Sequence, residues 1–366
     1  MNDRTLEINI NNIKNNIIGI KNWTKKLFLA VIKCDAYGMG AVHLSRYIQQ
    51  EVDYFGVETI EEAVQLRKNN IKKPILILGQ TLQEDIKYAD KYKVAITIGS
   101  LEFLKGISKK TKNSISVHLK FDTGMGRLGI APKDTEKILE VIHSSKNINL
   151  EGIFSHLATS EDPDKNFALE QINIFKNILK KFPGRKYITH IANSGGIINL
   201  PESYKDFSMV RSGLLLYGVY PSLFLRTFKK KSFITSAIIG RAKVLLIKDI
   251  PCGTSVGYGR TYICKKNIKI ALVSIGYGDG LNRKLSNKFF VKIKNKILPI
   301  IGNISMDQII IETPQNLDIK PGDECIFIDD ELNIENISQI CKTVPHEILC
   351  NLGKDRLKKV YIINTQ

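Results

Sequence analysis

The chain reads Leu27-Phe28-Leu29-Ala30-Val31-Ile32-Lys33-Cys34-Asp35-Ala36-Tyr37-Gly38-Met39-Gly40 near its N-terminal end. Six apolar residues lead directly into Lys33, and such a short continuous apolar run predicts a strand that is buried on both faces. A lysine at the end of a buried strand either reaches solvent along its apolar stem or is held in a site. A desolvated lysine loses its charge readily and can form a Schiff base with a carbonyl group. By itself the stretch favours an ordinary strand-end lysine, and the rest of the chain favours a site.

Length and composition indicate a soluble protein of two domains. The chain has 366 residues, of which 43% are hydrophobic and 25% charged, and this is ordinary for a soluble protein with an ample core. No apolar run approaches the length of a membrane span, and the N-terminus lacks the basic-then-apolar pattern of a signal peptide. We therefore expect a cytoplasmic location and no membrane partner.

The cysteine pattern argues against a disulfide framework and against a zinc site. None of the six cysteines belongs to a Cys-x-x-Cys pair, and several lie inside apolar, strand-like runs. We expect buried thiols and no metal. The cysteines are Cys34, Cys252, Cys264, Cys325, Cys341 and Cys350.

The net charge of +18 suggests a nucleic-acid partner at first sight. The lysines are scattered over predicted helix faces and loops, however, and asparagine and isoleucine are also abundant, so a general compositional drift accounts for the charge. The sequence shows no helix-turn-helix, zinc-finger or aromatic RNA-binding pattern. We expect no nucleic-acid partner, and binding at physiological salt would contradict this expectation.

Apolar runs alternate with helical patterns over about 200 residues, and this rhythm predicts an α/β fold, a TIM-like (β/α)8 barrel over residues 11–230. Helical patterns include residues 11–22, 59–67 and 134–143. The runs read as strands are 27–33, 54–57, 75–78, 94–98, 116–121, 150–156, 187–192 and 207–217.

Polar side chains occupy the C-terminal ends of these predicted strands, where barrels of this kind carry their chemistry. Each of them could be structural by itself. Loops after the seventh and eighth strands often bind phosphate through backbone N–H groups. Jointly the residues predict a phosphate pocket that faces a lysine. They are Lys33, Lys120, Asp122, Arg127, His156, His190, Asn193-Ser194-Gly195-Gly196 and Arg211-Ser212-Gly213.

The pattern changes after about residue 230, where strand-like runs are separated by turn signals instead of helices. The lysine-rich segment 227–231 is the expected boundary, and residues 231–366 are expected to form a mostly-β domain with one helix over 334–343. The runs read as strands are 233–250, 268–275, 289–301, 308–312, 324–328 and 358–363, with a turn at 294–296.

Six motifs, in this order, make the sequence resemble the alanine racemases over nearly its whole length. The resemblance implies an N-terminal barrel that binds pyridoxal 5'-phosphate (PLP), a C-terminal β domain, and a head-to-tail homodimer whose active sites use residues of both subunits. It also implies that the strand at residues 4–10 packs with the C-terminal domain. The motifs are residues 30–40, Lys120-Phe121-Asp122-Thr123-Gly124-Met125-Gly126-Arg127-Leu128-Gly129, His190-Ile191-Ala192-Asn193-Ser194, Val210-Arg211-Ser212-Gly213, Gly276-Tyr277-Gly278-Asp279-Gly280 and Ser305-Met306-Asp307-Gln308.

The resemblance also implies a two-base racemisation of alanine that supplies D-alanine for peptidoglycan, with PLP as the electron sink. Lys33 would hold PLP and then serve as the base for the D-enantiomer, and Tyr258 of the partner subunit would be the second base. His156 and Arg211 match the residues that support this tyrosine. Arg211 also matches the residue that faces the ring nitrogen of PLP.

The remaining roles follow from the same resemblance. Arg127 and the backbone at Met306 would bind the substrate carboxylate, and Tyr277 would lie at the entrance. Lys120 matches a lysine that is carbamylated in several family members, and the unmodified lysine remains the alternative. The other expected cofactor-binding residues are Tyr37, Asn193, Ser194, Gly213, Leu214 and Tyr361.

Two departures and several alternatives remain open. Ser212 stands where the family usually has proline, and residues 353–361 match the family's C-terminal pattern poorly, which affects the placing of Tyr361. A racemase that prefers another amino acid, such as serine, is the nearest alternative. A non-catalytic PLP carrier usually lacks the β domain, and a decarboxylase of similar plan usually places an acidic residue where this chain has Arg211.

Overall fold

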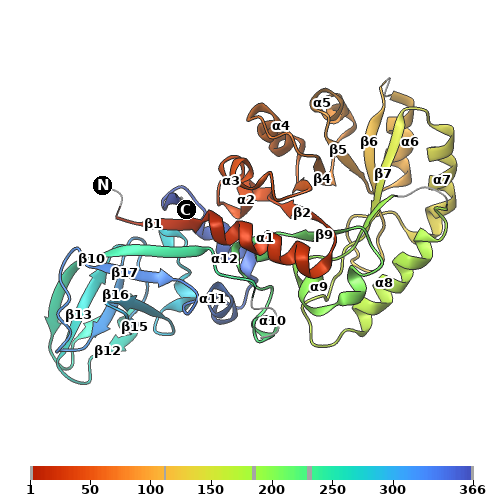
Figure 1. Ribbon diagram of the computed structural model, residues 1–366. Helices are drawn as coiled ribbons and strands as arrows, with labels where there is room; N and C mark the ends of the chain where they lie inside the picture. Colours follow the sequence, from red (N-terminus) through yellow and green to blue (C-terminus); the bar gives the residue numbers. More distant parts are fainter. Residues whose placement is uncertain (1–2, 111–112, 184–186, 229–232, 364–366) are drawn as a thin grey trace.

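The computed structural model describes residues 3–110, 113–183, 187–228 and 233–363. The chain forms a barrel of alternating strands and helices, drawn red to green in Figure 1, and a second part built on a sheet, drawn cyan to blue. The predicted (β/α)8 barrel and mostly-β C-terminal domain are both confirmed. None of the described helices has the length and apolar character needed to span a lipid bilayer.

The barrel strands are parallel and follow the order β8-β7-β6-β5-β4-β3-β2-β9. Backbone hydrogen bonds from Ser208 to Thr189 (2.8 Å) and from Arg211 to Ala192 (3.2 Å) connect the segments of β9 and β8, the two ends of this order, and so close the barrel. Strands covered on both faces read as continuous apolar runs. They are β2 (Leu27–Val31), β3 (Tyr54–Val57), β4 (Ile75–Gln80), β5 (Ala95–Ile98), β6 (Ile115–Lys120), β7 (Ile148–Phe154), β8 (Ile188–His190) and β9 (Met209–Ser212).

Most of the helices in this part cover the outside of the barrel. The first buries isoleucines spaced three and four apart between Ile10 and Ile20, and the Asn9 side chain caps it by accepting from the Asn12 N–H (3.0 Å). The helices are α1 (Ile10–Thr24), α2 (Lys33–Tyr37), α3 (Ala41–Ile48), α4 (Ile60–Lys68), α5 (Ile86–Tyr92), α6 (Leu101–Lys110), α7 (Thr135–Ser144), α8 (Asn166–Leu179), α9 (Ser194–Asn199) and α10 (Leu223–Arg226), with 3-10 helices η1 (Gln83–Asp85), η2 (Pro132–Asp134), η3 (Pro201–Ser203) and η4 (Leu214–Tyr217).

The second sheet has the order β13-β16-β15-β14-β17-β10-β1-β18. Its member β1 (Thr5–Asn9) comes from the N-terminus and pairs with β10 and β18. Figure 1 shows β1 in red beside the labelled strand β10. Lys294 and Asn295 have positive φ (50° and 60°) and form the two-residue turn of a hairpin. The other strands are β10 (Ile238–Ile250), β13 (Ile268–Val273), β14 (Phe290–Ile293), β15 (Lys296–Ile301), β16 (Ile309–Thr313), β17 (Glu324–Ile328) and β18 (Lys358–Ile362), with a separate pair β11 (Ser255–Val256) and β12 (Tyr262–Ile263).

Helices of the second part include one that the sequence did not predict. The expected helix at 334–343 is confirmed as α11 (Ile334–Cys341), and α12 (Pro345–Leu352) follows it. Pro345 in the first turn of α12 is the signal that could have revealed it, because proline suits the start of a helix. The 3-10 helices are η5 (Tyr258–Arg260), η6 (Tyr277–Asp279) and η7 (Arg283–Leu285).

Two further predictions are wrong in part. Residues 207–217 are not one strand, since β9 ends at Ser212 and η4 follows with buried side chains. The prediction failed because a buried apolar run has the same sequence pattern in a strand and in a helical turn. Cys34 and Cys252 are exposed and Cys350 is partly buried, because all three lie outside strands. The expected boundary at 227–231 falls largely on residues outside the described ranges and stays a prediction.

Candidate active site

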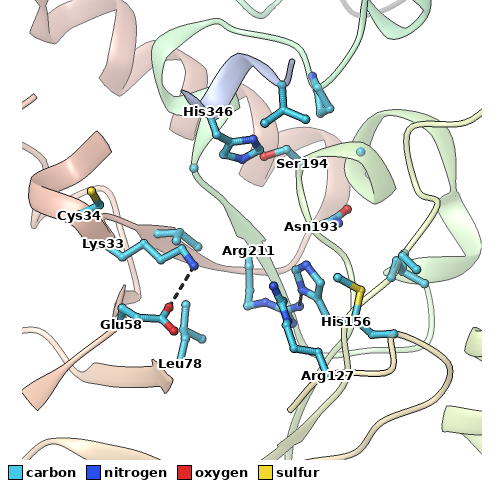
Figure 2. Close-up of a pocket in the computed structure, with 18 of the residues that line it drawn as sticks. Lys33, Cys34, Glu58, Leu78, Arg127, His156, Asn193, Ser194, Arg211 and His346 are labelled. Atoms are coloured by element: carbon cyan, nitrogen blue, oxygen red, sulfur yellow. Dashed lines mark hydrogen bonds and ion pairs between the residues drawn. The ribbon is translucent and has the colours of Figure 1, made fainter. Parts of the chain in front are cut away.

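A cavity of about 680 Å³ opens at the C-terminal ends of the barrel strands. Figure 2 shows side chains from several strands and loops of the barrel pointing into it, together with His346 of α12. Most of the site residues that the sequence predicts in the barrel meet in this cavity. Those that line it are Lys33, Tyr37, Lys120, Arg127, His156, Asn193, Ser194, Arg211 and Gly213.

Lys33 reaches the cavity from a turn of unusual backbone. Although α2 is helical in outline, each residue from Cys34 to Tyr37 has φ between 50° and 57°, in the left-handed region that L-residues rarely adopt. The Glu62 carboxylate accepts from the Cys34 N–H (2.6 Å), and Asp35 accepts from the Ala41 N–H (2.7 Å). These bonds hold the turn in place, and strain of this kind is common at functional sites.

The amine of Lys33 forms an ion pair with Glu58, with 3.0 Å between Nζ and Oε2, as the dashed line in Figure 2 marks. Glu58 follows β3, the neighbouring strand of the barrel. Both side chains are partly open to solvent, so the pair is weak in energy but defines where the amine lies.

Buried hydroxyl groups gather at another part of the cavity. The Tyr37 hydroxyl lies against the Cα of Gly213, so closely that a Cβ there would collide with it. The Ser194 and Ser212 hydroxyls are 3.0 Å apart and buried. Ser212, the departure noted in the sequence, therefore adds a hydroxyl beside a predicted phosphate ligand. Together with the backbone N–H groups of the Gly213-Leu214 turn, this arrangement suits a phosphate.

Arg211 is 3% exposed and forms a network with the ends of β7 and β8. Its Nη1 donates to His190 Nδ1 (2.7 Å), and its Nη2 lies within reach of His156 Nδ1 (3.1 Å) and of two backbone carbonyl oxygens. Burial lowers the pKa of Arg211 to about 9, so the guanidinium remains a cation at neutral pH. The carbonyl groups are those of Ser155 (2.9 Å) and Ile191 (3.2 Å).

Because arginine only donates, the network fixes the tautomers of the histidines. His156 and His190 accept at Nδ1, so each carries its proton on Nε2. His190 Nε2 then donates to His118 Nδ1 at 3.1 Å. Burial and the charge of Arg211 lower the pKa of His156 and of His190 well below the usual value, so both rings are neutral at pH 7.

Lys120 and Arg127 add cations to the same cavity. Lys120 is 7% exposed, and burial together with Arg211 and Arg127 lowers its pKa to about 8. Arg127 lies in a loop that folds around Asp122, whose carboxylate accepts three backbone N–H groups of residues 124–127. Four cations thus line a cavity whose carboxylates are Glu58, Glu161 and Glu347, which suits anionic ligands.

Five predicted site residues do not line the cavity. Tyr258, Tyr277 and Met306 lie in the second part of the chain and are 71%, 43% and 52% exposed. We call these three residues the exposed cluster. Hydrogen bonds tie Tyr258 and Tyr277 to the segment 303–306 that carries Met306: the Asn303 side chain donates to the Tyr258 carbonyl (2.8 Å), and the Tyr277 N–H donates to the Ser305 carbonyl (3.0 Å).

Tyr361 is the fourth residue outside the cavity, and its hydroxyl donates to the Met39 carbonyl (2.8 Å) while its ring stacks on His43. Leu214 is fully buried behind Gly213, so only its backbone could contribute to the site.

The sequence missed several cavity residues, among them a group on α12. His346, Glu347 and Cys350 line the cavity from this helix, and Glu58 lines it from the barrel. Pro345 was the one sequence signal for α12, and no local sequence pattern predicted that Glu58 belongs to the site. Within the described residues, no group of three or more His, Cys, Asp or Glu side chains is arranged to hold a metal ion.

Comparisons with known proteins agree over the whole chain. Residues 8–221 match the family model "Alanine racemase, N-terminal domain", and residues 237–361 match "Alanine racemase, C-terminal domain". Alanine racemase 2 of Caldanaerobacter subterraneus subsp. tengcongensis is 38% identical over 98% of this chain and 94% of its own length.

Solved structures give the same result. The alanine racemase of Clostridium difficile 630 superposes with a TM-score of 0.88 at 35% identity, covering 98% of this chain and 96% of its own. The alanine racemase of Bartonella henselae, solved with covalently bound pyridoxal phosphate, has a TM-score of 0.88 at 30% identity, covering 98% and 99%. With both halves of the chain matched and full-length relatives above 30% identity, the chain belongs to the alanine racemase family.

Proposed function

We propose that this chain is a PLP-dependent racemase that interconverts L-alanine and D-alanine and supplies D-alanine for peptidoglycan. The observation that carries the proposal is a single cavity in which Lys33 meets the Arg211 network and a phosphate-binding turn. The full-length relatives bear the name alanine racemase, which supports this substrate over serine. The cytoplasmic location stays a prediction from the sequence.

The residues of the cavity fit PLP. Tyr37, Ser194 and the backbone of Gly213 and Leu214 would hold the phosphate, and Ser212 supports Ser194 through their hydroxyl contact. Asn193 shapes the same loop, because its side chain accepts from the Gly196 N–H (2.9 Å) and caps α9. The covalently bound pyridoxal phosphate in the Bartonella henselae relative supports the assignment.

The cofactor would supply an electron sink that makes the α-proton of the amino acid acidic. Lys33 would hold the cofactor and then move a proton on one face of the substrate. Tyr258 of the partner subunit would move a proton on the opposite face. An ordinary tyrosine hydroxyl, with a pKa of about 10, is almost fully protonated at neutral pH and so needs hydrogen-bond support to act as a base.

His156 and Arg211 would give that support. The tautomer deduced above places the only proton of the His156 ring on Nε2, so this nitrogen is a hydrogen-bond donor. Arg211 holds the ring in that orientation and would face the cofactor's ring nitrogen. Because arginine donates and does not accept, it would keep that nitrogen unprotonated and so moderate the electron sink.

The cations of the cavity would bind the substrate carboxylate. Arg127 is exposed within the cavity wall, beside the buried Lys120, and the two repel each other. A carbamylated Lys120 would be an anion and would attract Arg127 instead, which would orient the guanidinium. The backbone at Met306 would complete the carboxylate site, and Tyr277 would lie at its entrance.

The exposed cluster supports a homodimer with shared active sites. Tyr258, Tyr277 and Met306 have catalytic, entrance and substrate roles in this proposal, yet none lines the cavity of its own chain. In a two-fold symmetric pair, with the head of each subunit against the tail of the other, the cluster of each subunit would lie at the cavity of the other. Such two-fold, isologous dimers are the commonest oligomers.

The decisive experiment is proton NMR of L-alanine in D2O with the purified protein and added PLP, followed by chiral analysis. We expect loss of the α-proton signal and formation of D-alanine. The matched control is Lys33→Arg, which keeps a cation beside Glu58 but removes the nucleophilic amine, and should lose at least about a thousandfold in rate. Absence of exchange with alanine, or faster exchange with L-serine, would overturn the substrate assignment.

A further inference from the structure

Two cysteines from distant parts of the chain face each other at the cavity wall. Cys34 lies in the left-handed turn directly after Lys33, and Cys350 lies on α12, 316 residues further along the chain. Their sulfur atoms are 4.0 Å apart, and both residues line the cavity. Figure 2 shows Cys34 beside Lys33. The mechanism proposed above uses neither thiol.

The two sulfur atoms lie near enough for a disulfide to form after a small movement. The sulfur atoms of a disulfide are about 2.05 Å apart, so these two need to approach by about 2 Å. Cys34 is exposed and Cys350 is partly buried, so a small oxidant can reach the first sulfur and the second is poised behind it. In a reducing compartment such pairs remain as thiols and act in redox sensing rather than in holding the fold together.

We propose that Cys34 and Cys350 form a reversible disulfide when the protein meets a peroxide, and that this bond switches the enzyme off. The formation of the bond does not depend on the proposed function, whereas its effect on catalysis does. The reduced enzyme is then the active form, and the cross-linked enzyme is the inactive form.

The chemistry balances in two steps. The Cys34 thiol gives up its proton, and its sulfur attacks one oxygen of hydrogen peroxide. The O–O bond breaks, the leaving hydroxide takes up the proton, and the products are a sulfenic acid and water. The Cys350 sulfur then attacks the sulfenic sulfur, the S–S bond forms, and a second water leaves. Two thiols are thus oxidised by two electrons in total, and one peroxide is reduced to two waters. A dithiol reverses the bond by thiol–disulfide exchange.

The order of attack follows from the surroundings of the two thiols. Burial raises the pKa of Cys350 to about 11, so this group is a thiol at neutral pH and a poor first nucleophile. Cys34 is the exposed member of the pair and meets the oxidant first. Once the sulfenic acid has formed, Cys350 lies within 4.0 Å to resolve it.

The bond would disturb catalysis because Cys34 directly follows Lys33 in the chain. Bringing the two sulfurs together moves the turn or α12 by up to about 2 Å, and a misplacement of about 1 Å in an active site can cost a hundredfold in rate. The same bond joins the barrel to α12 across a long loop, which limits the freedom of the unfolded chain. Activity should therefore fall while the unfolding temperature rises, whereas general oxidative damage lowers both.

The test treats the holoenzyme with hydrogen peroxide, blocks free thiols with an alkylating agent, and digests the protein without reduction. Mass spectrometry should find the Cys34 and Cys350 peptides linked, with the mass of two hydrogens lost. Activity should fall at least about tenfold, the unfolding temperature should rise by several degrees, and dithiothreitol should restore both. Cys252→Ser is the matched control, because Cys252 is exposed but does not line the cavity, and it should behave like the unchanged protein.

For the variants Cys34→Ser and Cys350→Ser, the rate after peroxide treatment is compared with the rate of the same variant before treatment. Neither should form the linked peptide, gain in unfolding temperature, or recover with dithiothreitol. The proposed bond is overturned if the linked peptide is missing from the unchanged protein while Cys34 is alkylated or carries two added oxygens. The switch is overturned if the linked peptide forms and the activity stays the same. An enzyme inactive before treatment would count against the proposed function instead, since the mass measurement reports the bond independently.

Discussion

Lys120 shows how the surroundings of one residue can prepare it for a chemical modification. Its side chain is 7% exposed, and its ammonium lies 5.5 Å from the centre of the Phe154 ring. Burial is the main cause of its lowered pKa, and the guanidinium groups of Arg211 and Arg127 add to it. A lysine with a pKa of about 8 is partly neutral at physiological pH, and only the neutral amine reacts with carbon dioxide.

We expect Lys120 to be carbamylated, and the extent should rise from pH 7 to pH 9. The amine attacks carbon dioxide and loses a proton, so at fixed bicarbonate the modified fraction follows the neutral amine. For a pKa near 8, the neutral fraction of the unmodified amine rises from about one tenth at pH 7 to about nine tenths at pH 9. Carbon-13 NMR of protein in labelled bicarbonate should show one carbamate signal that grows with pH.

The control for this experiment is a pair of single substitutions. Lys120→Met should abolish the signal, and Lys137→Met, at an exposed lysine of α7, should leave it unchanged. A signal that survives in Lys120→Met, or a spectrum without any carbamate at pH 9, would contradict the assignment.

Among the elements, the left-handed turn of α2 runs most strongly against local preference. Left-handed backbone costs about 1–2 kcal/mol for each L-residue, so four in a row require support from outside the turn. Glu62 of α4 provides much of it, because its carboxylate accepts from the N–H groups of Cys34 (2.6 Å) and Glu58 (2.7 Å). One carboxylate thus fixes the segments that carry both members of the Lys33–Glu58 pair.

We expect Glu62→Ala to lower the free energy of unfolding by about 1–2 kcal/mol, because it leaves these N–H groups without their acceptor and removes the capping box of α4. It should also weaken PLP binding, because the turn carries Lys33 and Tyr37. Urea denaturation and a PLP titration measure the two effects. Glu61→Ala is the matched control, since Glu61 has the same charge in the same first turn but is exposed. Equal effects of the two substitutions would exclude a special role for Glu62.

At the scale of the whole molecule, buried charges hold the second part of the chain against the barrel. Glu335 of α11 is 1% exposed and accepts from the Tyr220 N–H (2.7 Å), and it pairs with Arg226 (3.2 Å). Gly38 and Gly353 touch through their backbones, so closely that neither position has room for a Cβ. These contacts place α12 on the cavity of its own chain, while the exposed cluster remains available to a partner.

A cis-trans test distinguishes shared active sites from sites within one chain. A mixed dimer of Lys33→Arg and Tyr258→Phe subunits, isolated with two different affinity tags, contains one complete site if the sites are shared. Such a dimer should have about half the wild-type rate, although each variant alone is inactive. Racemisation of L-alanine measures the result.

The matched control combines both substitutions in one subunit and leaves the other unchanged. Shared sites predict an inactive dimer in this arrangement, because each site then lacks one base. Sites within one chain predict the reverse pattern, with about half the activity here and none in the first arrangement. Shared sites and sites within one chain therefore predict opposite activities for the two mixed dimers.

The sequence by itself determined the architecture and most of the barrel's contribution to the site. Apolar runs alternating with helical patterns specify a closed parallel sheet, and the carboxyl ends of parallel strands meet at one edge. Lys33, Lys120, His156 and Arg211 follow or end such strands and therefore converge, although they lie far apart in the chain. Local sequence patterns suffice to predict this convergence, because each strand and the polar residue at its C-terminal end can be recognised from neighbouring residues alone.

Only the tertiary structure decided what other elements bring to that edge. The contributions of α12, the carboxylates of Glu58 and Glu62, and the approach of Cys34 to Cys350 depend on contacts between segments that no local pattern links. The left-handed turn opposes its local preference, and it is supported by the Glu62 carboxylate of another element, which accepts from the Cys34 N–H. Tyr361 fits a phosphate role by sequence, yet the packing of β18 directs its hydroxyl to Met39. Strand patterning is a local property, whereas the pairing of side chains across a cavity is set by the packing of the whole chain.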